Sequence, residues 1–167
     1  MTDTSRATTT PIERCLEGWH RHLRGEAGVT LDDLLHEDVT FWSPIVFSPQ
    51  QGREITKLYL TAAGSTLAGG SGGSGGSGSS GGESSDEARS EGGSAGKFRY
   101  VRTIHQGNDA VLEFETTMDG LYVNGVDLIT CDDDARIVDF KVMIRPLKAI
   151  DAVHAQMRAM LERLQEG

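Results

Sequence analysis

The sequence predicts an α+β fold in which a curved antiparallel sheet packs against helices and an extra helix follows near the C-terminus. Two changes of periodicity along the 167 residues lead to this prediction. Apolar residues recur at helical spacing in the first 67 positions and again after Pro146, whereas residues 98–145 alternate between apolar and polar side chains, as strands do. A segment of different composition separates the two regions.

The first expected element is a helix with its own start signal. Thr10 supplies a capping hydroxyl, Pro11 suits the first helical position, and Glu13 stands three residues after the cap. The residues at helical spacing on its expected buried face are Ile12, Cys15, Leu16, Trp19 and Leu23. A short second helix begins after Thr30 and has two acids in its first turn, where the helix dipole favours them.

A short strand and a third helix are expected next. Residues 39–43 alternate and end at Pro44, which predicts a strand with Val39, Phe41 and Ser43 on one face. After Gly52 the spacing becomes helical again, and this pattern fades near residue 67. Its apolar stripe consists of Ile55, Leu58, Tyr59 and Ala62.

The second half of the chain reads as a meander of strands followed by a helix. Turn signals separate expected strands at residues 98–105, 110–118, 123–131 and 136–145, and a closing amphipathic helix covers residues 147–165. Because side chains alternate between the two faces of a sheet, one face can be assigned to the interior. Its expected members are Leu112, Phe114, Thr116, Met118, Asp127, Ile129, Cys131, Val138, Phe140, Val142 and Ile144.

Residues 69–96 have the composition of a flexible linker, with 12 Gly and 9 Ser among 28 residues. The repeats of Gly-Gly-Ser lack the Gly-Lys-Ser/Thr ending of a phosphate-binding loop and follow a helix, not a strand. We therefore interpret residues 69–96 as a disordered loop insertion within a single domain covering residues 1–167.

Charge and cysteine content exclude several classes of function. The net charge is −9, and the chain outside residues 69–96 still has −6, so a basic surface for nucleic acid is not expected. No apolar run approaches the roughly 20 residues that span a bilayer, and the first ten residues lack the apolar core of a secretory signal. Cys15 and Cys131 fit neither a zinc pattern nor a disulfide framework and are interpreted as buried thiols in a cytoplasmic protein. No metal or cofactor is expected.

Several short segments in a fixed order resemble the nuclear transport factor 2-like superfamily, in particular its SnoaL-like branch. No single motif is diagnostic, and the order and spacing of all of them form the resemblance. It covers nearly everything except residues 69–96 and the last helix. The segments are Phe41-Trp42-Ser43-Pro44, Gln51-Gly52-Arg53-Glu54-Ile55 with Tyr59, Asp119-Gly120, Gly125-Val126-Asp127 and Arg136-Ile137-Val138-Asp139-Phe140.

This resemblance implies a conical half-barrel with a pocket between the sheet and the helices. In isomerases of this superfamily, a tyrosine and a protonated aspartic acid bind an enolate oxygen while a second carboxylate moves the proton. Asp127 occupies the position of the protonated acid in that pattern. Trp19 replaces the tyrosine, and Ser43 replaces the second carboxylate, so the sequence departs from those isomerases at two of three positions.

Two functions remain open from the sequence. The first is binding of a small, largely apolar molecule, with cofactor-independent isomerase, lyase or hydrolase chemistry at Asp127. The expected ligand contacts are Trp19, Phe41, Ser43, Tyr59, Leu112, Phe114, Thr116, Met118, Ile129, Phe140 and Val142. The second is a non-catalytic binding or assembly module in which Asp127 is a structural carboxyl. The resemblance also implies a homodimer through the outer sheet face, with Asp139, Lys141, Met143 and Arg145 as expected members.

Overall fold

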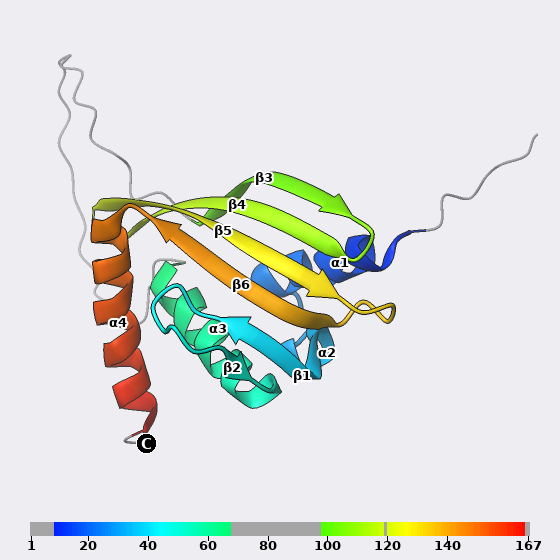
Figure 1. The fold of residues 1–167 in the computed structure, drawn as a ribbon, viewed down its shortest axis with the longest axis horizontal. Helices are drawn as coiled ribbons and strands as arrows, with labels where there is room; N and C mark the ends of the chain where they lie inside the picture. The colour runs from blue at the N-terminus through cyan, green and yellow to red at the C-terminus, as the bar shows by residue number, and fades with distance from the viewer. Residues whose placement is uncertain (1–8, 68–97, 119, 166–167) are drawn as a thin grey trace, which may run out of the picture.

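Six strands form one sheet in the order β2-β1-β6-β5-β4-β3 (Figure 1). The computed structural model describes residues 9–67, 98–118 and 120–165. The four long strands pair antiparallel in chain order, and their ends lie within two residues of the predicted ones. They are β3 (Arg99–Gln106), β4 (Asp109–Met118), β5 (Leu121–Cys131) and β6 (Ile137–Arg145).

The expectation of a purely antiparallel sheet is wrong at one edge. β1 (Leu35–Trp42) pairs parallel to β6, and the short β2 (Gln50–Gln51), which was not predicted, pairs antiparallel to β1. β1 and β6 are separated in the chain by a helix and four strands, so no hairpin dictates their relative direction. β1 also starts four residues earlier than expected, because α2 leads directly into it.

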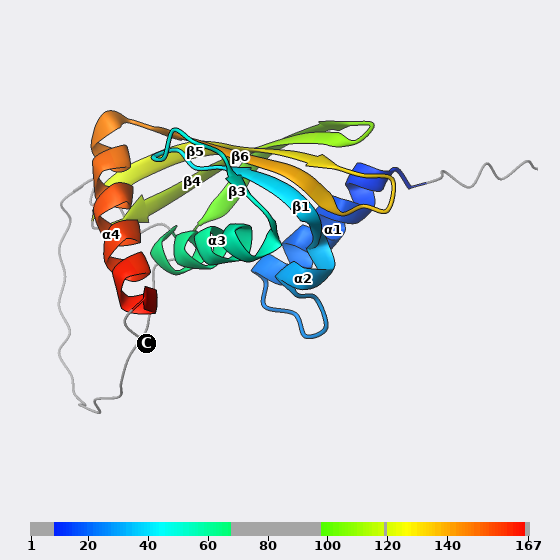
Figure 2. The same cartoon turned by 60° about the horizontal axis from the view of Figure 1, so that its bottom comes forward.

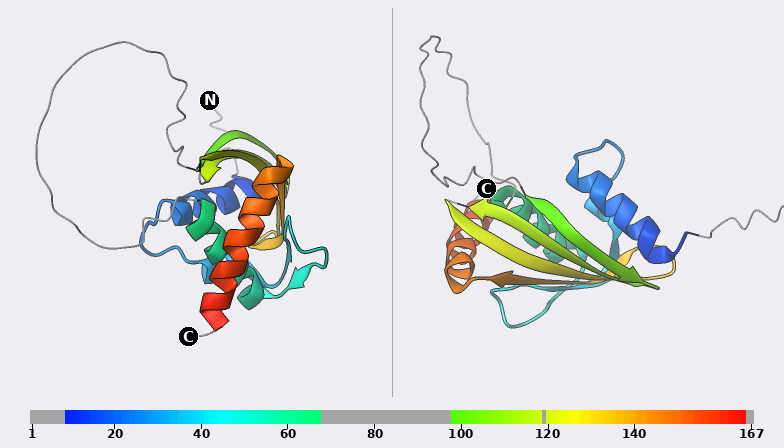
Figure 3. Two further views of the ribbon diagram at one scale, coloured as in Figure 1. Left: turned by 90° about the vertical axis from the view of Figure 1, so that its left-hand side faces the viewer. Right: turned by 90° about the horizontal axis from the view of Figure 1, so that it is seen from above.

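Three helices cover one face of the sheet, and no helix of the described residues covers the other face, called the bare face below (Figure 2). They are α1 (Pro11–Leu23), α2 (Leu31–Leu34) and α3 (Arg53–Leu67), while α4 (Leu147–Gln165) crosses one end and contacts α3 and β6. The sheet arches over the helices without closing into a barrel (Figure 3). The predicted α+β cone with an added C-terminal helix is therefore confirmed.

The start of α1 follows the predicted capping arrangement. The Thr10 hydroxyl accepts from the Glu13 backbone N–H at 3.4 Å, and the Glu13 carboxylate accepts from the Thr10 N–H at 2.7 Å. These bonds satisfy N–H groups that have no partner within the helix. The predicted inner face is buried except for Leu23, which is 44% exposed at the helix end.

The interior contains the predicted face of the meander, with one local shift. Phe114, Asp127, Ile129 and Phe140 are all buried. At the start of β6, however, an irregularity in the pairing with β5 leaves Val138 without a partner and turns Ile137 into the core. A bulge of this kind breaks the two-residue period of the side chains. A regular alternation assigns Val138 to the interior, and the bulge makes that assignment wrong.

Gly125 allows a close approach that shapes this interior. A Cβ at this position would lie 2.7 Å from the Met143 carbonyl oxygen and would collide with the Phe114 ring. The absence of a side chain lets the Phe114 ring lie directly over β5.

Two expectations concern residues outside the described ranges. They are the disordered insertion at residues 69–96 and the position of Asp119 in the Asp119-Gly120 turn. Gly120 is described, and its positive φ of 77° suits a glycine in a turn. In the described part of the chain, no helix combines the length and apolar character needed to cross a membrane.

Candidate functional site

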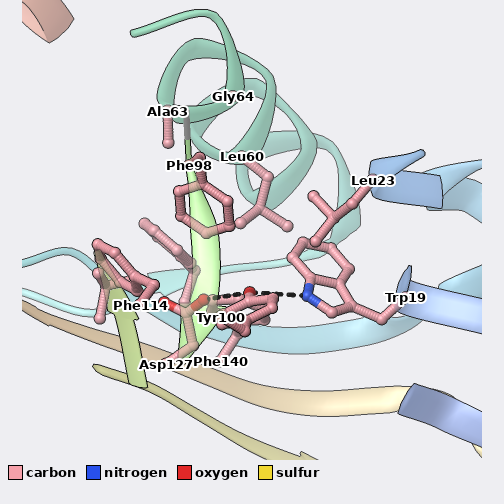
Figure 4. Close-up of a pocket in the computed structure, with 12 residues that line it drawn as sticks. Trp19, Leu23, Leu60, Ala63, Gly64, Phe98, Tyr100, Phe114, Asp127 and Phe140 are labelled. Atoms are coloured by element: carbon pink, nitrogen blue, oxygen red, sulfur yellow. Dashed lines mark hydrogen bonds between the residues drawn. The ribbon is translucent and has the colours of Figure 1, made fainter. Parts of the chain in front are cut away.

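A cavity of about 90 Å³ lies between the inner face of the sheet and helices α1 and α3 (Figure 4). Every lining residue except Tyr100 and Asp127 lacks an ionisable side chain. Leu23 is 44% exposed and Gly64 is exposed, so the mouth of the cavity lies between α1 and α3. The lining consists of Trp19, Leu23, Phe41, Leu60, Ala63, Gly64, Phe98, Tyr100, Phe114, Asp127, Phe140 and Val142.

Three polar groups in this apolar cavity form a hydrogen-bonded chain. The Trp19 indole N–H donates to the Tyr100 hydroxyl oxygen at 2.9 Å, and the Tyr100 O–H donates to Asp127 Oδ2 at 2.6 Å (Figure 4). An indole nitrogen can only donate, so the Tyr100 oxygen accepts from Trp19, and its own proton is free to bond to the Asp127 carboxylate.

The second oxygen of Asp127 is open to the cavity. Among the described residues, Tyr100 is the only group that hydrogen-bonds to this carboxyl, through Oδ2. No described side chain has a fully buried polar atom without a partner, so Oδ1 retains accessible surface. Because Asp127 is only 5% exposed and lines the cavity, that surface faces the cavity. A ligand would find one free polar atom there.

Burial controls the protonation of this carboxyl. Desolvation raises the pKa of Asp127 from 3.8 to about 7, and the hydrogen bond from Tyr100 opposes part of that rise. Burial and the neighbouring carboxyl raise the pKa of Tyr100 well above its usual value, so the phenol stays neutral. Near neutral pH, Asp127 is therefore available both as an acid and as a base.

Aromatic rings hold the members of the chain in place. The Trp19 ring packs against Phe140 with centroids 5.2 Å apart, and the Tyr100 ring meets Phe98 edge-on at 5.1 Å. Phe98 in turn contacts Phe114 at 5.1 Å. These rings exclude water from the hydrogen bonds and keep the environment of Asp127 apolar.

The structure brings half of the sequence-predicted site residues to this cavity. Trp19, Phe41, Phe114, Asp127, Phe140 and Val142 line it. Four others point inward from the sheet and are buried without lining it. These four are Leu112, Thr116, Met118 and Ile129.

Ser43 and Tyr59 lie at a second hollow, of about 190 Å³, between α3, α4 and residues 43–46. The Ser43 hydroxyl accepts from the backbone N–H groups of Ile45 and Val46 at 3.2 and 3.4 Å. Tyr59 is 9% exposed and packs against Phe41 at 5.3 Å. In this position the Ser43 hydroxyl stabilises a turn.

Sequence reasoning missed Tyr100, although a signal for it existed. The strand at residues 98–105 was predicted, and its alternation places Phe98 and Tyr100 on one face. Tyr100 pairs with Phe114 in the register of the sheet, which turns this face to the cavity. The residues of α3 that line the cavity were also missed. The apolar stripe expected on this helix runs through Tyr59 and Ala62, and the residues that line the cavity lie on the neighbouring side of the helix. The cavity-facing residues of α3 are Leu60, Ala63 and Gly64.

Comparison with known proteins identifies the fold. No family model matches the chain, and no curated protein matches its sequence. Among solved structures, the chain is similar to a steroid delta-isomerase from Pseudomonas aeruginosa, with a TM-score of 0.73 and 25% identity over 98% of this chain and 100% of that one.

Two further structures share the fold at lower identity. An NTF2-like protein of unknown function from Mesorhizobium loti has a TM-score of 0.56 and 17% identity, covering 83% of this chain and 97% of its own. A protein assigned to the SnoaL-like polyketide cyclases, from Shewanella putrefaciens CN-32, has a TM-score of 0.54 and 8% identity, covering 91% and 90%. The chain therefore has the fold of the NTF2-like proteins, with a SnoaL-like protein among its structural neighbours.

Proposed function

We propose that the cavity binds a small, largely apolar molecule with one polar group, and that Asp127 exchanges a proton with it. The observation that carries this proposal is the open Oδ1 atom of Asp127 in a cavity whose other accessible walls are apolar. Below its pKa the carboxyl can donate to a carbonyl oxygen, and above it the carboxylate can accept from a hydroxyl. A single polar contact in an apolar pocket determines the orientation of the ligand.

The size of the cavity restricts the ligand. Its volume is about 90 Å³, whereas an engineered cavity of about 150 Å³ is the kind that holds benzene. A molecule larger than a few heavy atoms would have to extend through the mouth between Leu23 and Gly64. The similarity to a steroid delta-isomerase supports isomerase chemistry for this fold. A steroid would require the walls to move apart.

The absence of a second acid limits the chemistry. Of the described residues that line the cavity, Asp127 is the only carboxylic acid, and Ser43 lies outside the cavity. One carboxyl must then both remove and return the proton, as in a cofactor-independent isomerase, and a pKa of about 7 suits both steps. The rival function is a binding module without turnover, which the small volume and the single acid favour.

Ligand binding is tested by thermal shift with small ketones and phenols at about pH 5.5 and about pH 8.5, on either side of the Asp127 pKa. We expect ketones to stabilise the protein more at the lower pH and phenols more at the higher pH. In Asp127→Asn this dependence on pH should disappear, because the amide does not titrate. Asp151→Asn, an exposed acid on α4, is the matched control. Equal profiles in wild type and Asp127→Asn would refute the proposed role.

Proton transfer is tested separately. In D2O, a bound ketone should exchange the hydrogens next to its carbonyl faster with wild-type protein, and Asp127→Asn should lose this acceleration by at least about tenfold. Nuclear magnetic resonance follows the exchange directly. Binding without exchange would identify the non-catalytic module, and neither binding nor exchange would refute both functions.

We also propose that the bare face of the sheet pairs two copies of the chain in the cytoplasm. Met143 is 53% exposed there, and Val111 and Tyr122 are 38% and 46% exposed on the same face. Asp139 accepts from the Trp42 indole at 2.7 Å, and Lys141 lies 4.7 Å from the Trp42 ring centre, so two of the predicted interface charges are already ordered. Two free buried cysteines agree with a reducing compartment.

Light scattering after size exclusion tests the dimer. Wild type should have twice the chain mass of 18.0 kDa, and Met143→Glu should have the mass of one chain because it replaces an exposed apolar side chain of the proposed interface with a charge. Phe47→Glu is the control, since Phe47 is fully exposed on the loop between β1 and β2 and is not among the predicted interface residues. A monomeric wild type at high micromolar concentration would refute the dimer.

A further inference from the structure

The second hollow, of about 190 Å³, lies where α4 crosses the end of the sheet beside α3 (Figure 1). It is larger than the cavity at Asp127 and also exceeds the engineered cavity of about 150 Å³ that holds benzene. Tyr59 of α3, residues 43–46 and one side of α4 line it. Among the described residues, none lines both spaces, so the hollow is a separate candidate site.

One stripe of α4 supplies the charged groups of this hollow. His154, Arg158 and Glu162 follow one another at intervals of four residues, so they lie one above the other on the helix surface. Arg158 Nε donates to Glu162 Oε1 at 3.1 Å, whereas the two terminal nitrogens of the guanidinium have no hydrogen-bonding partner in the described part of the chain. A pair of such nitrogens is the group that binds both oxygens of a carboxylate.

Two hydroxyl groups at the hollow can also donate. Tyr59 is only 9% exposed, and its hydroxyl makes no hydrogen bond to a described residue. Because no described side chain has a fully buried polar atom without a partner, this hydroxyl keeps accessible surface, and the hollow is the space that Tyr59 lines. The Ser43 oxygen accepts two backbone N–H groups, which leaves the proton of its own hydroxyl free to donate.

The other walls of the hollow are apolar and open to solvent on one side. Met157 is 5% exposed, Ile45 is half-buried against the core, and Val46 is 38% exposed. The apolar part of a small molecule can therefore be buried here without any movement of the helices. The hollow combines this apolar surface with donors that lack a partner, which is the usual composition of a small-molecule site.

We propose that this hollow binds a small carboxylic acid with an apolar body, in its carboxylate form. The carboxylate accepts from the terminal nitrogens of Arg158 and from the Tyr59 hydroxyl, while the apolar body packs on Met157. Glu162 is the only acid among the described lining residues, and Arg158 already pairs with it. The groups that still lack a partner are donors, so a ligand that accepts hydrogen bonds is preferred over a cationic one. This site does not depend on Asp127 or on the function proposed above.

Nuclear magnetic resonance of the full-length protein tests the proposal with benzoate as the probe. Benzyl alcohol and benzylamine carry the same ring and serve as the neutral and cationic comparisons. At about pH 8 the ionised Asp127 repels benzoate from the first cavity. We expect benzoate at up to about 10 mM to shift the amide signals of residues 43–46 and of α4, and benzylamine to bind most weakly. Benzylamine binding as tightly as benzoate, shifts confined to residues around Asp127, or no shifts would overturn the proposal.

Two variants and a matched control locate the binding. Arg158→Gln should raise the Kd for benzoate by at least about threefold, as expected for a partly exposed charge pair. Tyr59→Phe keeps the buried ring and removes only the hydroxyl, so the Kd should rise by about fivefold. Arg99→Gln is the control, because Arg99 is 70% exposed and paired with a glutamate, as Arg158 is at 73%. An unchanged Kd in Arg158→Gln, or an equal rise in Arg99→Gln, would contradict the assigned site.

Asp127→Asn separates this site from the proposed function. The variant should bind benzoate at the hollow with the same Kd as wild type, because Asp127 does not line it. Loss of benzoate binding in Asp127→Asn would place the ligand in the first cavity and refute the second site. Failure of the ketone and phenol experiments would refute the first site and leave the benzoate result unaffected.

Discussion

The Asp127→Asn variant is expected to be more stable than wild type at pH 8 and about equally stable at pH 4. In the folded protein the carboxyl keeps its proton up to a pKa of about 7, whereas in the unfolded chain it loses it near 3.8. Between these values the folded state binds the extra proton, so the free energy of unfolding decreases as the pH rises. At about 1.4 kcal/mol per pH unit, the loss is roughly 4 kcal/mol for this fully buried group.

Urea unfolding between pH 4 and pH 8.5 measures this effect as the difference in the free energy of unfolding between wild type and Asp127→Asn. All other titrating groups are common to wild type and Asp127→Asn, so the difference isolates Asp127. It should grow from pH 4 to about pH 7 and then remain constant. The amide introduced by Asp127→Asn keeps an oxygen that can accept from Tyr100, so the variant is expected to fold.

Tyr100→Phe provides the complementary control. It keeps the carboxyl and removes the hydrogen bond that lowers its pKa. The decrease in stability should then continue to a higher pH than in wild type. A difference between wild type and Asp127→Asn that does not change with pH would show that the carboxyl is not titrating in the folded protein.

Phe140→Ala is expected to lower the free energy of unfolding by about 3–5 kcal/mol, the usual cost of emptying a buried aromatic site. Phe140 is 1% exposed and contacts Trp19 and Phe41, with ring centres 5.2 and 6.0 Å apart. Because it also lines the cavity, the variant should bind larger aromatic ligands than wild type does. A folded Phe140→Ala protein with an unchanged ligand size limit would contradict the assigned cavity wall.

The same urea experiment measures the loss of stability in Phe140→Ala, and Leu147→Ala is its control. Leu147 is also a large apolar residue, but it is 72% exposed at the start of α4. Its removal should change the free energy of unfolding by no more than about 0.5 kcal/mol. Comparable losses in the two variants would mean that burial does not explain the effect.

Periodicity was sufficient for the four helices, for five of the six described strands and for most of the inner face of the sheet. Alternation placed Phe114, Asp127 and Phe140 in the interior, and the Thr10 capping pattern marked the start of α1; both predictions are confirmed. These features depend on neighbours within a few residues, which a sequence displays directly. The bulge at Val138 lies beyond this reasoning, because it depends on how β6 is paired with β5.

The sequence by itself determined the α+β cone, the buried position of Asp127 and the apolar character of its neighbours. Only the tertiary structure decided that Tyr100 donates to Asp127 and that Ser43 faces a different hollow. The physical reason is that side-chain periodicity assigns a residue to a face, whereas a contact between distant elements depends on strand register and on the rotation and position of each helix.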